Sequence, residues 1–310
     1  MDFPPAFADR FPVWKNLAGE QYSWLVTDRN SRQFVYKLLI NQGNNLEPVL
    51  ERVTGLAANC TTLVAPVEYG QIDHFLYQIT PFFPTGSLRD YIQGHGNLSD
   101  AQLRTLILDI STALNALHTP QDDQSYLVHG DVKPSNILIS TTEERGIRFG
   151  LADFDAALLV TPEGARGARR ITPRYASPER LGGGSIGITA DYWSVGMVLL
   201  EALFGHHPFD GQPESDIRDQ LLTQWQPDFT EIDGMLWRAL SGGLMARENT
   251  IRWTHEKILL CLNEDPSVIS EGLQLAGERA TEVPFIVGNK PVYSARELAK
   301  ALLVRWEAIG

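Results

Sequence analysis

Short apolar runs alternate with polar turns in the first part of the chain. The segments that read as strands are 24–26, 33–39, 63–69 and 74–80. Over residues 46–58, apolar side chains recur at helical spacing, namely Leu46, Val49, Leu50, Val53 and Leu56. The pattern therefore predicts a small β-rich region with one helix, which ends at a proline-containing segment, residues 81–86.

The remainder of the chain shows mostly helical patterns. They cover residues 87–93, 99–118, 190–204, 214–223, 232–240 and 254–262. The segment 190–204 is strongly apolar but shorter than the ~20 residues of a membrane span, which predicts a buried central helix. Short apolar runs predict brief strands at 126–128, 137–139 and 147–151.

The pattern changes near residue 265, where the packed core is expected to end. Residues 281–310 predict a strand at 283–287, a turn at 288–289, a second short strand and a helix over 294–306. The apolar stripe of this helix consists of Leu298, Leu302, Leu303 and Trp306. This stripe either packs on the rest of the chain or docks a partner through residues 281–310.

Composition narrows the classes of function. Among 310 residues, 43% are hydrophobic and 21% charged, which describes a soluble globular protein. The net charge of −12, from 26 basic and 38 acidic residues, argues against general binding to nucleic acids or membranes. The two cysteines, Cys60 and Cys261, have no metal-ligand spacing, and no secretory leader is visible. We therefore expect a reducing, cytoplasmic environment.

Two short segments carry polar side chains at fixed offsets, HGDVKPSN at residues 129–136 and ADFD at residues 152–155. Phosphoryl transfer from ATP needs a carboxylate that accepts the proton of the attacking hydroxyl and a lysine that steadies the phosphate. It also needs an amide oxygen and a second carboxylate that hold Mg²⁺. We therefore expect ATP and Mg²⁺ as cofactors. The expected roles are base for Asp131, phosphate clamp for Lys133, and metal ligands for Asn136 and Asp153.

The pattern H-x-D-x-K-x-x-N followed by D-F-x resembles the eukaryotic-type serine/threonine protein kinase family. The segments TPRYASPE at 172–179 and DYWSVG at 191–196 are similar to the T-P-x-Y-x-A-P-E and D-x-W-S-x-G of that family. The resemblance implies an α+β, bilobal fold, to which the pattern of residues 281–310 adds a short C-terminal strand-turn-helix appendage. We therefore expect a kinase domain (13–265), made of an N-lobe (13–80), a hinge (81–86) and a C-lobe (87–265), and an appendage of unknown role (266–310).

The resemblance also implies roles in the β-rich region. Lys37 corresponds to the lysine that contacts the α- and β-phosphates and pairs with a glutamate of the helix. Glu51 is the expected glutamate, with Glu47 as its competitor. The adenine ring is expected to contact the hinge backbone at Pro81 and Phe83.

Three positions depart from the family pattern. Only Gly19 remains of the glycine-rich loop G-x-G-x-x-G-x-V that approaches the phosphates. Gly130 replaces an arginine that grips a phosphorylated activation loop, which implies activity without that phosphate. Asp155 stands where glycine is usual, and we favour a turn residue there over an additional metal ligand.

Other matched residues have implied roles in substrate class and stability. Thr172, together with Lys133, is the serine/threonine pattern and is expected to act at the catalytic site as an unmodified hydroxyl. Glu179 is expected to form a buried pair with Arg252, and Asp191 to hold the backbone of the catalytic loop. The basic run that is either a solvated loop or a dock for an acidic peptide or phosphate consists of Arg166, Arg169, Arg170 and Arg174.

Three functions remain open. The first is ATP- and Mg²⁺-dependent transfer to Ser/Thr hydroxyls of protein substrates. The second is a pseudokinase that serves as a binding or scaffold module, which the degraded glycine loop and Asp155 favour but the otherwise complete set of polar residues opposes. The third is a small-molecule phosphotransferase, because HGD with DFD is similar to aminoglycoside and choline kinases. Those enzymes generally lack the T-P-x-Y-x-S-P-E and D-x-W-S-x-G segments.

Overall fold

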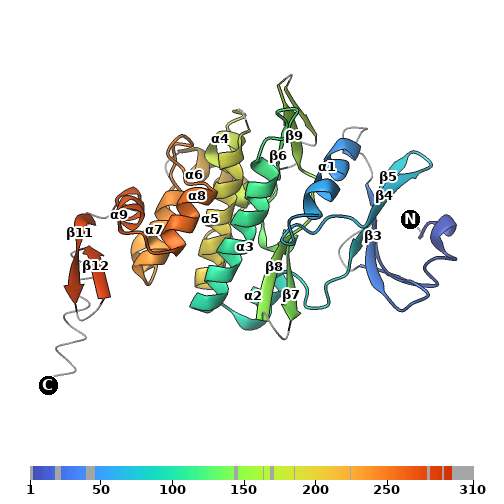
Figure 1. The fold of residues 1–310 in the computed structure, drawn as a ribbon, viewed down its shortest axis with the longest axis horizontal. Coiled ribbons are helices and arrows are strands. Elements are labelled where there is room, and N and C mark those ends of the chain that lie inside the picture. The colour runs from blue at the N-terminus through green and yellow to red at the C-terminus, as the bar shows by residue number, and fades with distance from the viewer. Residues whose placement is uncertain are drawn as a thin grey trace. The chain divides into compact units, whose positions relative to one another are not determined.

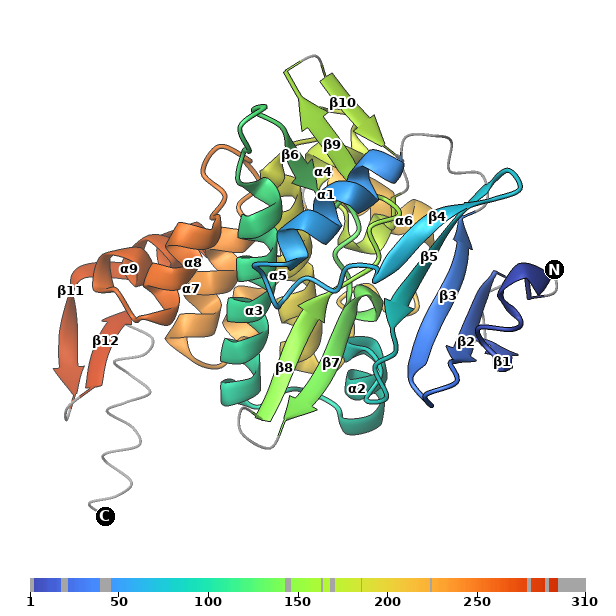
Figure 2. The same cartoon turned by 45° about the vertical axis from the view of Figure 1, so that its right-hand side comes forward.

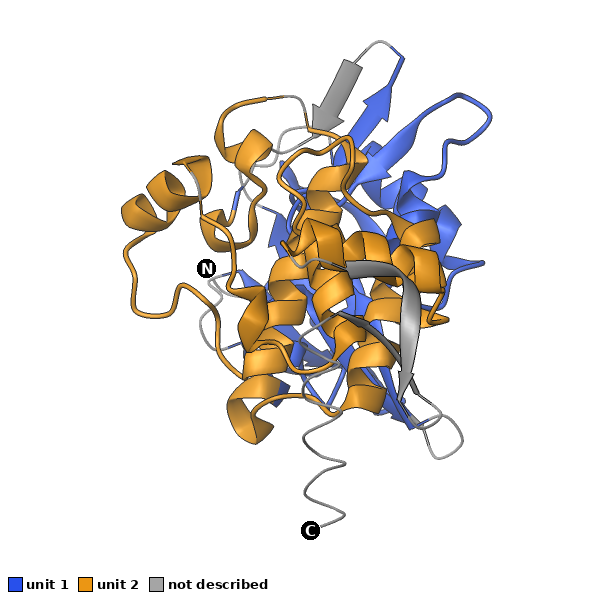
Figure 3. Ribbon diagram, turned by 90° about the vertical axis from the view of Figure 1, so that its left-hand side faces the viewer, with its two compact units in different colours: residues 1–91, 112–171 blue, residues 92–111, 172–310 orange. Residues whose placement is uncertain are grey.

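The computed structural model describes residues 3–17, 22–39, 46–142, 146–162, 164–167, 171–184, 186–223, 225–277, 280–287 and 290–294. The chain divides into two compact units (Figure 3), unit 1 with residues 1–91 and 112–171, and unit 2 with residues 92–111 and 172–310. The chain passes between the units within α2 (Leu88–His95) and within α3 (Asp100–His118). Strands dominate unit 1 and helices dominate unit 2, which confirms the predicted α+β class.

Unit 1 contains an antiparallel sheet of order β1-β2-β3-β5-β4 (Figure 2). Its strands are β1 (Val13–Asn16), β2 (Ser23–Thr27), β3 (Gln33–Leu39), β4 (Glu68–Ile72) and β5 (Phe75–Pro81), and helix α1 (Glu47–Ala57) follows β3. The N-terminal segment, with the 3₁₀ turn η1 (Pro5–Phe7), packs on this sheet through Phe3 and Phe11, which join Trp24 and Tyr36 in a buried aromatic cluster. Covering this cluster removes a large apolar area from water, which stabilises the sheet that carries Lys37.

Short strands complete unit 1. They are β6 (Tyr126–Val128), β7 (Ile137–Thr142), β8 (Gly146–Leu151), β9 (Leu158–Thr161) and β10 (Gly164–Gly167), with the 3₁₀ turn η2 (Pro134–Asn136) before β7. The β7–β8 hairpin and the β10-β9-β6 sheet flank the HGDVKPSN segment. The predicted strand at 63–69 is shifted, because the N–H of Val64 bonds to the carbonyl of Leu151 at 2.8 Å, at the end of β8, so the sheet strand β4 begins only at Glu68.

Unit 2 is a set of helices packed around α5 (Figure 1). Its elements are the 3₁₀ turn η3 (Pro173–Tyr175), α4 (Pro178–Leu181), α5 (Ile188–Phe204), α6 (Glu214–Thr223), the 3₁₀ turn η4 (Phe229–Glu231), α7 (Met235–Leu244), α8 (His255–Leu262) and α9 (Pro266–Leu275). Residues 190–202 of α5 are all buried, which confirms the predicted central helix. No helix in the described ranges is both long and apolar enough to cross a bilayer.

The core of unit 2 continues past residue 265, where the sequence predicts its end. Asp265 caps α9 by accepting from the N–H groups of Ser267 and Val268, and α9 buries Val268, Ile269 and Leu273. Beyond α9, β11 (Ala280–Val287) and β12 (Lys290–Ser294) pair antiparallel, which agrees with the two predicted strands, while the predicted turn at 288–289 lies outside the described residues. The predicted helix at 294–306 and its apolar stripe lie outside the described residues.

Close packing of α7 on α9 depends on glycine. A Cβ on Gly242 would lie 2.3 Å from the carbonyl oxygen of Gly272 and 2.8 Å from the backbone nitrogen of Ala276, so Gly242→Ala forces the two helices apart. We expect the free energy of unfolding to fall by about 1–3 kcal/mol, measured by chemical denaturation. The matched control is Gly94→Ala, where nothing lies within 4 Å of the added Cβ and helix propensity should stabilise α2 by ~0.5–1 kcal/mol. Equal stability of Gly242→Ala and wild type would contradict the close approach.

Candidate active site

His129 fixes the backbone of the HGDVKPSN segment. Its ring is fully buried, its Nδ1 accepts the N–H of Asp131 at 3.2 Å, and its Nε2 donates to the carbonyl of Ala152 at 3.1 Å. Because Nδ1 is the acceptor, the proton of the neutral imidazole is on Nε2. The ring also meets Phe154 edge-on, with centroids 5.1 Å apart. His129 therefore ties the segment that carries Asp131 to the ADFD segment.

The predicted residues Asp131, Lys133 and Asn136 come together in the structure. Lys133 Nζ lies 2.6 Å from Asp131 Oδ2, and Asn136 Nδ2 donates to the backbone carbonyl of Asp131 at 2.9 Å. The turn η2 returns the chain so that Asn136 faces Asp131, and the carbonyl of Asn136 accepts the N–H of Ala152 at 2.9 Å. A carboxylate beside an ammonium group is thus held in a rigid, mostly buried loop.

Asp153 is the second residue of the ADFD segment, which begins directly after β8 ends at Leu151. It follows Ala152, whose backbone bonds to both His129 and Asn136. Its φ of 63° is in the left-handed region, which aspartate tolerates better than most residues. Its carboxylate is 3.1 Å from Lys37 Nζ. Burial raises the pKa of Asp153, but the charge of Lys37 and the hydrogen bond from Lys37 lower this pKa by more. The pKa of Asp153 therefore lies below its usual value. Asp153 is therefore ionised at neutral pH.

Asp155 lies in a turn, as predicted, and the N–H of Ala157 closes this turn on the carbonyl of Phe154 at 3.0 Å. Asp155 is also buried and bonded, which the turn prediction does not include. Its side chain is only 6% exposed, and Oδ2 lies 2.7 Å from Lys37 Nζ. Oδ1 accepts from Gln78 Nε2 at 3.3 Å. Burial and then the charge of Asp153 raise its pKa to about 6. Local turn preference could not reveal this role, because Lys37 and Gln78 come from β3 and β5, far away in the sequence.

Lys37 lies on β3, and its described carboxylate contacts are with Asp153 and Asp155. Glu51, the predicted partner, is exposed on α1, and so is its competitor Glu47. The structure therefore supports a different carboxylate partner for Lys37 than the sequence predicts. The apolar stripe of α1 already indicates this outcome, because Glu51 lies outside the face of the helix that the stripe buries.

The other predicted site residues have mixed outcomes. Pro81 ends β5 opposite Phe34, and the carbonyl of Phe83 accepts the N–H of Gly86 at 3.0 Å. Within the described part of the chain, the N–H of Phe83 has no hydrogen-bond partner. Gly19 lies outside the described residues. Thr172 precedes η3 in unit 2, and its catalytic role stays a prediction.

The structural pair predicted in unit 2 is confirmed. Arg252 donates to both carboxylate oxygens of Glu179, at 2.6 and 3.1 Å, and its side chain is 0% exposed. The guanidinium also lies 5.1 Å above the ring of Trp193. Asp191 is buried in α5, whereas its contact with the catalytic loop stays a prediction.

The donor set fits a magnesium ion that is shared with phosphates. Asn136 uses its amide nitrogen on the backbone, and among described residues its Oδ1 has no partner. With the ionised Asp153, it supplies the oxygen ligands that Mg²⁺ prefers. No three or more His, Cys, Asp or Glu side chains in the described ranges gather as a metal cluster. Mg²⁺ is usually held by one or two carboxylates plus substrate phosphates.

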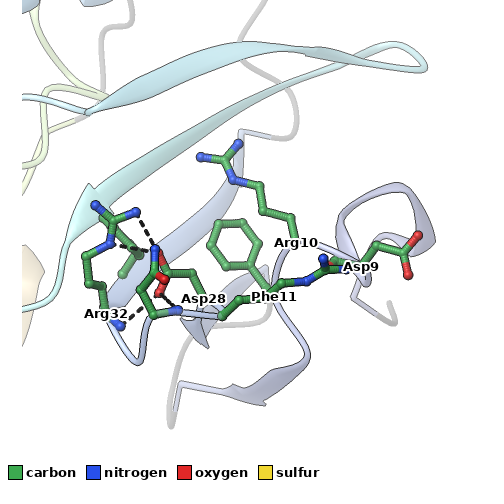
Figure 4. A pocket seen from close by; sticks show the side chains of 8 residues that line it. Asp9, Arg10, Phe11, Asp28 and Arg32 are labelled. Carbon is green, nitrogen blue, oxygen red and sulfur yellow. Dashed lines mark hydrogen bonds and ion pairs between the residues drawn. The ribbon is translucent and has the colours of Figure 1, made fainter.

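A separate cavity of about 450 Å³ lies in unit 1 beside the turn between β2 and β3 (Figure 4). Its arginines already have acceptors, in the pairs Arg10–Glu68 at 2.6 Å, Arg32–Asp28 at 2.8 Å and Arg29 Nε to the carbonyl of Asp9 at 3.1 Å. An anionic ligand would have to bind these arginines, but each arginine already donates to an acceptor of the protein. We therefore assign no ligand to this cavity.

Comparison with known proteins identifies the family. Residues 30–262 match the family model for the protein kinase domain. Serine/threonine-protein kinase ULK3 from Xenopus laevis is 31% identical over 149 residues, 48% of this chain and 30% of that protein. Probable serine/threonine-protein kinase PknB from Bifidobacterium longum (strain NCC 2705) is 29% identical over 196 residues, 60% of this chain and 27% of that protein. Maternal embryonic leucine zipper kinase from Danio rerio is 36% identical over 140 residues, 44% of this chain and 19% of that protein.

The family match covers most of the chain and includes Lys37, Asp131, Lys133, Asn136 and Asp153, whereas Gly19 lies before it. This chain belongs to the protein kinase family. It spans no more than 30% of the length of the three relatives.

Proposed function

We propose that this chain transfers the γ-phosphoryl group of ATP to Ser or Thr hydroxyls of protein substrates, with Mg²⁺ as cofactor. The observation that carries the proposal is the arrangement in unit 1, where Asp131 contacts Lys133 and Asn136, and Lys37 contacts Asp153. The arrangement provides a base, a phosphate clamp, oxygen ligands and a phosphate-binding lysine, as phosphoryl transfer requires.

Each side chain has one step in the proposed mechanism. Asp131 accepts the proton of the substrate hydroxyl. The oxygen of that hydroxyl forms a bond to the γ-phosphorus while the bond from the γ-phosphorus to the β–γ bridging oxygen breaks, which releases ADP. Lys133 holds the transferring phosphate, and Lys37 orients the α- and β-phosphates. Asn136 and Asp153 would hold Mg²⁺, which neutralises charge on the phosphates. The N–H of Phe83 would donate to the adenine ring.

The alternatives have less support. All the polar residues of the mechanism are present, which opposes a pseudokinase, and the matched relatives are named as protein kinases rather than small-molecule phosphotransferases. We also propose that the substrates are proteins and that residues 281–310 dock a partner. A cytoplasmic location also belongs to the proposal, supported by the free, buried state of Cys60 and Cys261.

Asp131→Asn should reduce phosphoryl transfer by about 10²–10⁴-fold, because no base remains for the hydroxyl proton. The assay is incubation of γ-labelled ATP and Mg²⁺ with a generic acceptor protein, followed by identification of the labelled residues. Asp9→Asn, an exposed carboxylate of unit 1, is the matched control and should keep the wild-type rate.

Two results would contradict the proposal. Wild-type protein that binds ATP but transfers no label to any protein, including itself, would favour a pseudokinase. Transfer by Asp131→Asn at the wild-type rate would remove this residue from the mechanism.

A further inference from the structure

One carboxylate joins two neighbouring strands of the sheet in unit 1. Lys37 on β3 and Gln78 on β5 are direct partners in the antiparallel register, so both side chains leave the same face of the sheet. Asp155 receives both, with Oδ2 at 2.7 Å from Lys37 Nζ and Oδ1 at 3.3 Å from Gln78 Nε2. The amine of Lys37 is thus held at a fixed position relative to both strands.

The two aspartates beside Lys37 differ in exposure. The side chain of Asp153 is 34% exposed, whereas that of Asp155 is only 6% exposed. A partly exposed carboxylate such as Asp153 can turn toward a metal ion and give up part of its contact with Lys37. A buried carboxylate that left its cationic partner would remain uncompensated, which is strongly unfavourable. Asp155 is therefore the partner that stays on Lys37.

Helix α1 turns its glutamates away from the core. Val49, Leu50 and Val53 are fully buried, while Glu47 and Glu51 are exposed. At about 100° per residue, Glu51 lies ~200° around the helix from both Val49 and Val53, on the opposite face. The place of a helix glutamate next to Lys37 is accordingly taken by Asp155, where the family pattern usually has glycine.

We propose that Asp155 is the positioning residue for Lys37, in place of a glutamate from α1. The inference rests on the proposed function, since Lys37 held in this way would present its amine to the phosphates of ATP. Asp155 itself touches no reacting atom and acts only through Lys37. Phosphate binding by Lys37 then requires no ion pair with α1.

The first test measures the reactivity of Lys37 without nucleotide, metal or turnover. The intact protein is acetylated with a trace of acetic anhydride, and mass spectrometry compares the peptide of Lys37 with that of the exposed Lys15. Loss of the ion pair with Asp155 leaves the amine held only by its remaining contacts, including Asp153, so Asp155→Asn and Asp155→Gly should raise the relative acetylation of Lys37 several-fold. Glu51→Gln should raise it less than either.

The second test separates positioning from general stability. Asp155→Asn keeps the size of the side chain and the acceptor for Gln78 but removes the charge. We expect it to raise the KM for ATP and to lower kcat/KM by at least about tenfold, with an unchanged melting temperature. Asp155→Glu restores the charge and should recover part of this loss.

The informative comparison is Asp155→Gly, which introduces the residue usual in the family. Retained kcat/KM and unchanged Lys37 acetylation in this variant, with a gain of acetylation in Glu51→Gln, would overturn the inference in favour of the helix glutamate. The acetylation result stands even if wild-type protein transfers no phosphate. Failure of the proposed function and failure of this inference are therefore distinguishable.

Discussion

Asp153→Asn is expected to abolish phosphoryl transfer while leaving the fold intact. The variant replaces the carboxylate that we propose holds Mg²⁺ with a neutral amide, so the developing charge on the phosphates would lose its compensation. We expect the rate to fall more than 100-fold, which corresponds to ~2.7 kcal/mol in the barrier. The φ of 63° at this position suits asparagine as well as aspartate, and Asp155 remains on Lys37, so the structure should persist.

The measurement is the initial rate with labelled ATP at several Mg²⁺ concentrations, together with a thermal melt. Asp73→Asn is a close control, because Asp73 also has a positive φ, 54°, but is exposed in the turn between β4 and β5. It should keep both rate and melting temperature. A rate for Asp153→Asn within about tenfold of wild type, a barrier change below ~1.4 kcal/mol, would exclude the role assigned to this carboxylate.

The parts of the site that are local in sequence could be predicted well. Asp131, Lys133 and Asn136 lie within one loop, and a short turn is enough to bring them together. The pair between Glu179 and Arg252 joins distant segments, and only the resemblance to a known family could predict it. The central helix followed directly from its apolar composition.

The partner of Lys37 could not be predicted in the same way. Local preference, which is all that a short D-F-D segment offers, predicts the turn at Asp155 that the structure has, but it does not predict the partners of the side chain. Its role depends on the register between β3 and β5, which places Lys37 beside Gln78. Distance along the chain favours Glu51 as the partner, although the apolar stripe of α1 indicates that this position faces outward. Periodicity was the better guide here, because burial decides which face of a helix meets the core.

The second large effect is expected on stability, in unit 2. Glu179→Ala should lower the free energy of unfolding by about 3–5 kcal/mol, because it leaves the buried guanidinium of Arg252 without its charge partner. Arg252→Ala should cost a similar amount, since it removes the same pair and the contact with Trp193. Urea denaturation measures both. Lys257→Ala breaks an exposed pair with Glu271 and should cost no more than about 1 kcal/mol.

The pH dependence of the same pair gives an independent check. Burial raises the pKa of Glu179, but the hydrogen bond and charge of Arg252 lower it more, so the folded-state pKa lies below the usual 4.5. A carboxyl whose pKa is lower in the folded state stabilises the fold above the unfolded pKa, and this contribution disappears as pH falls through the folded pKa. The stability difference between wild type and Glu179→Ala should therefore be full at neutral pH and shrink below about pH 4.5. A difference that is already small at pH 7 would refute the buried pair, because Arg252 would then not depend on Glu179 for its compensation.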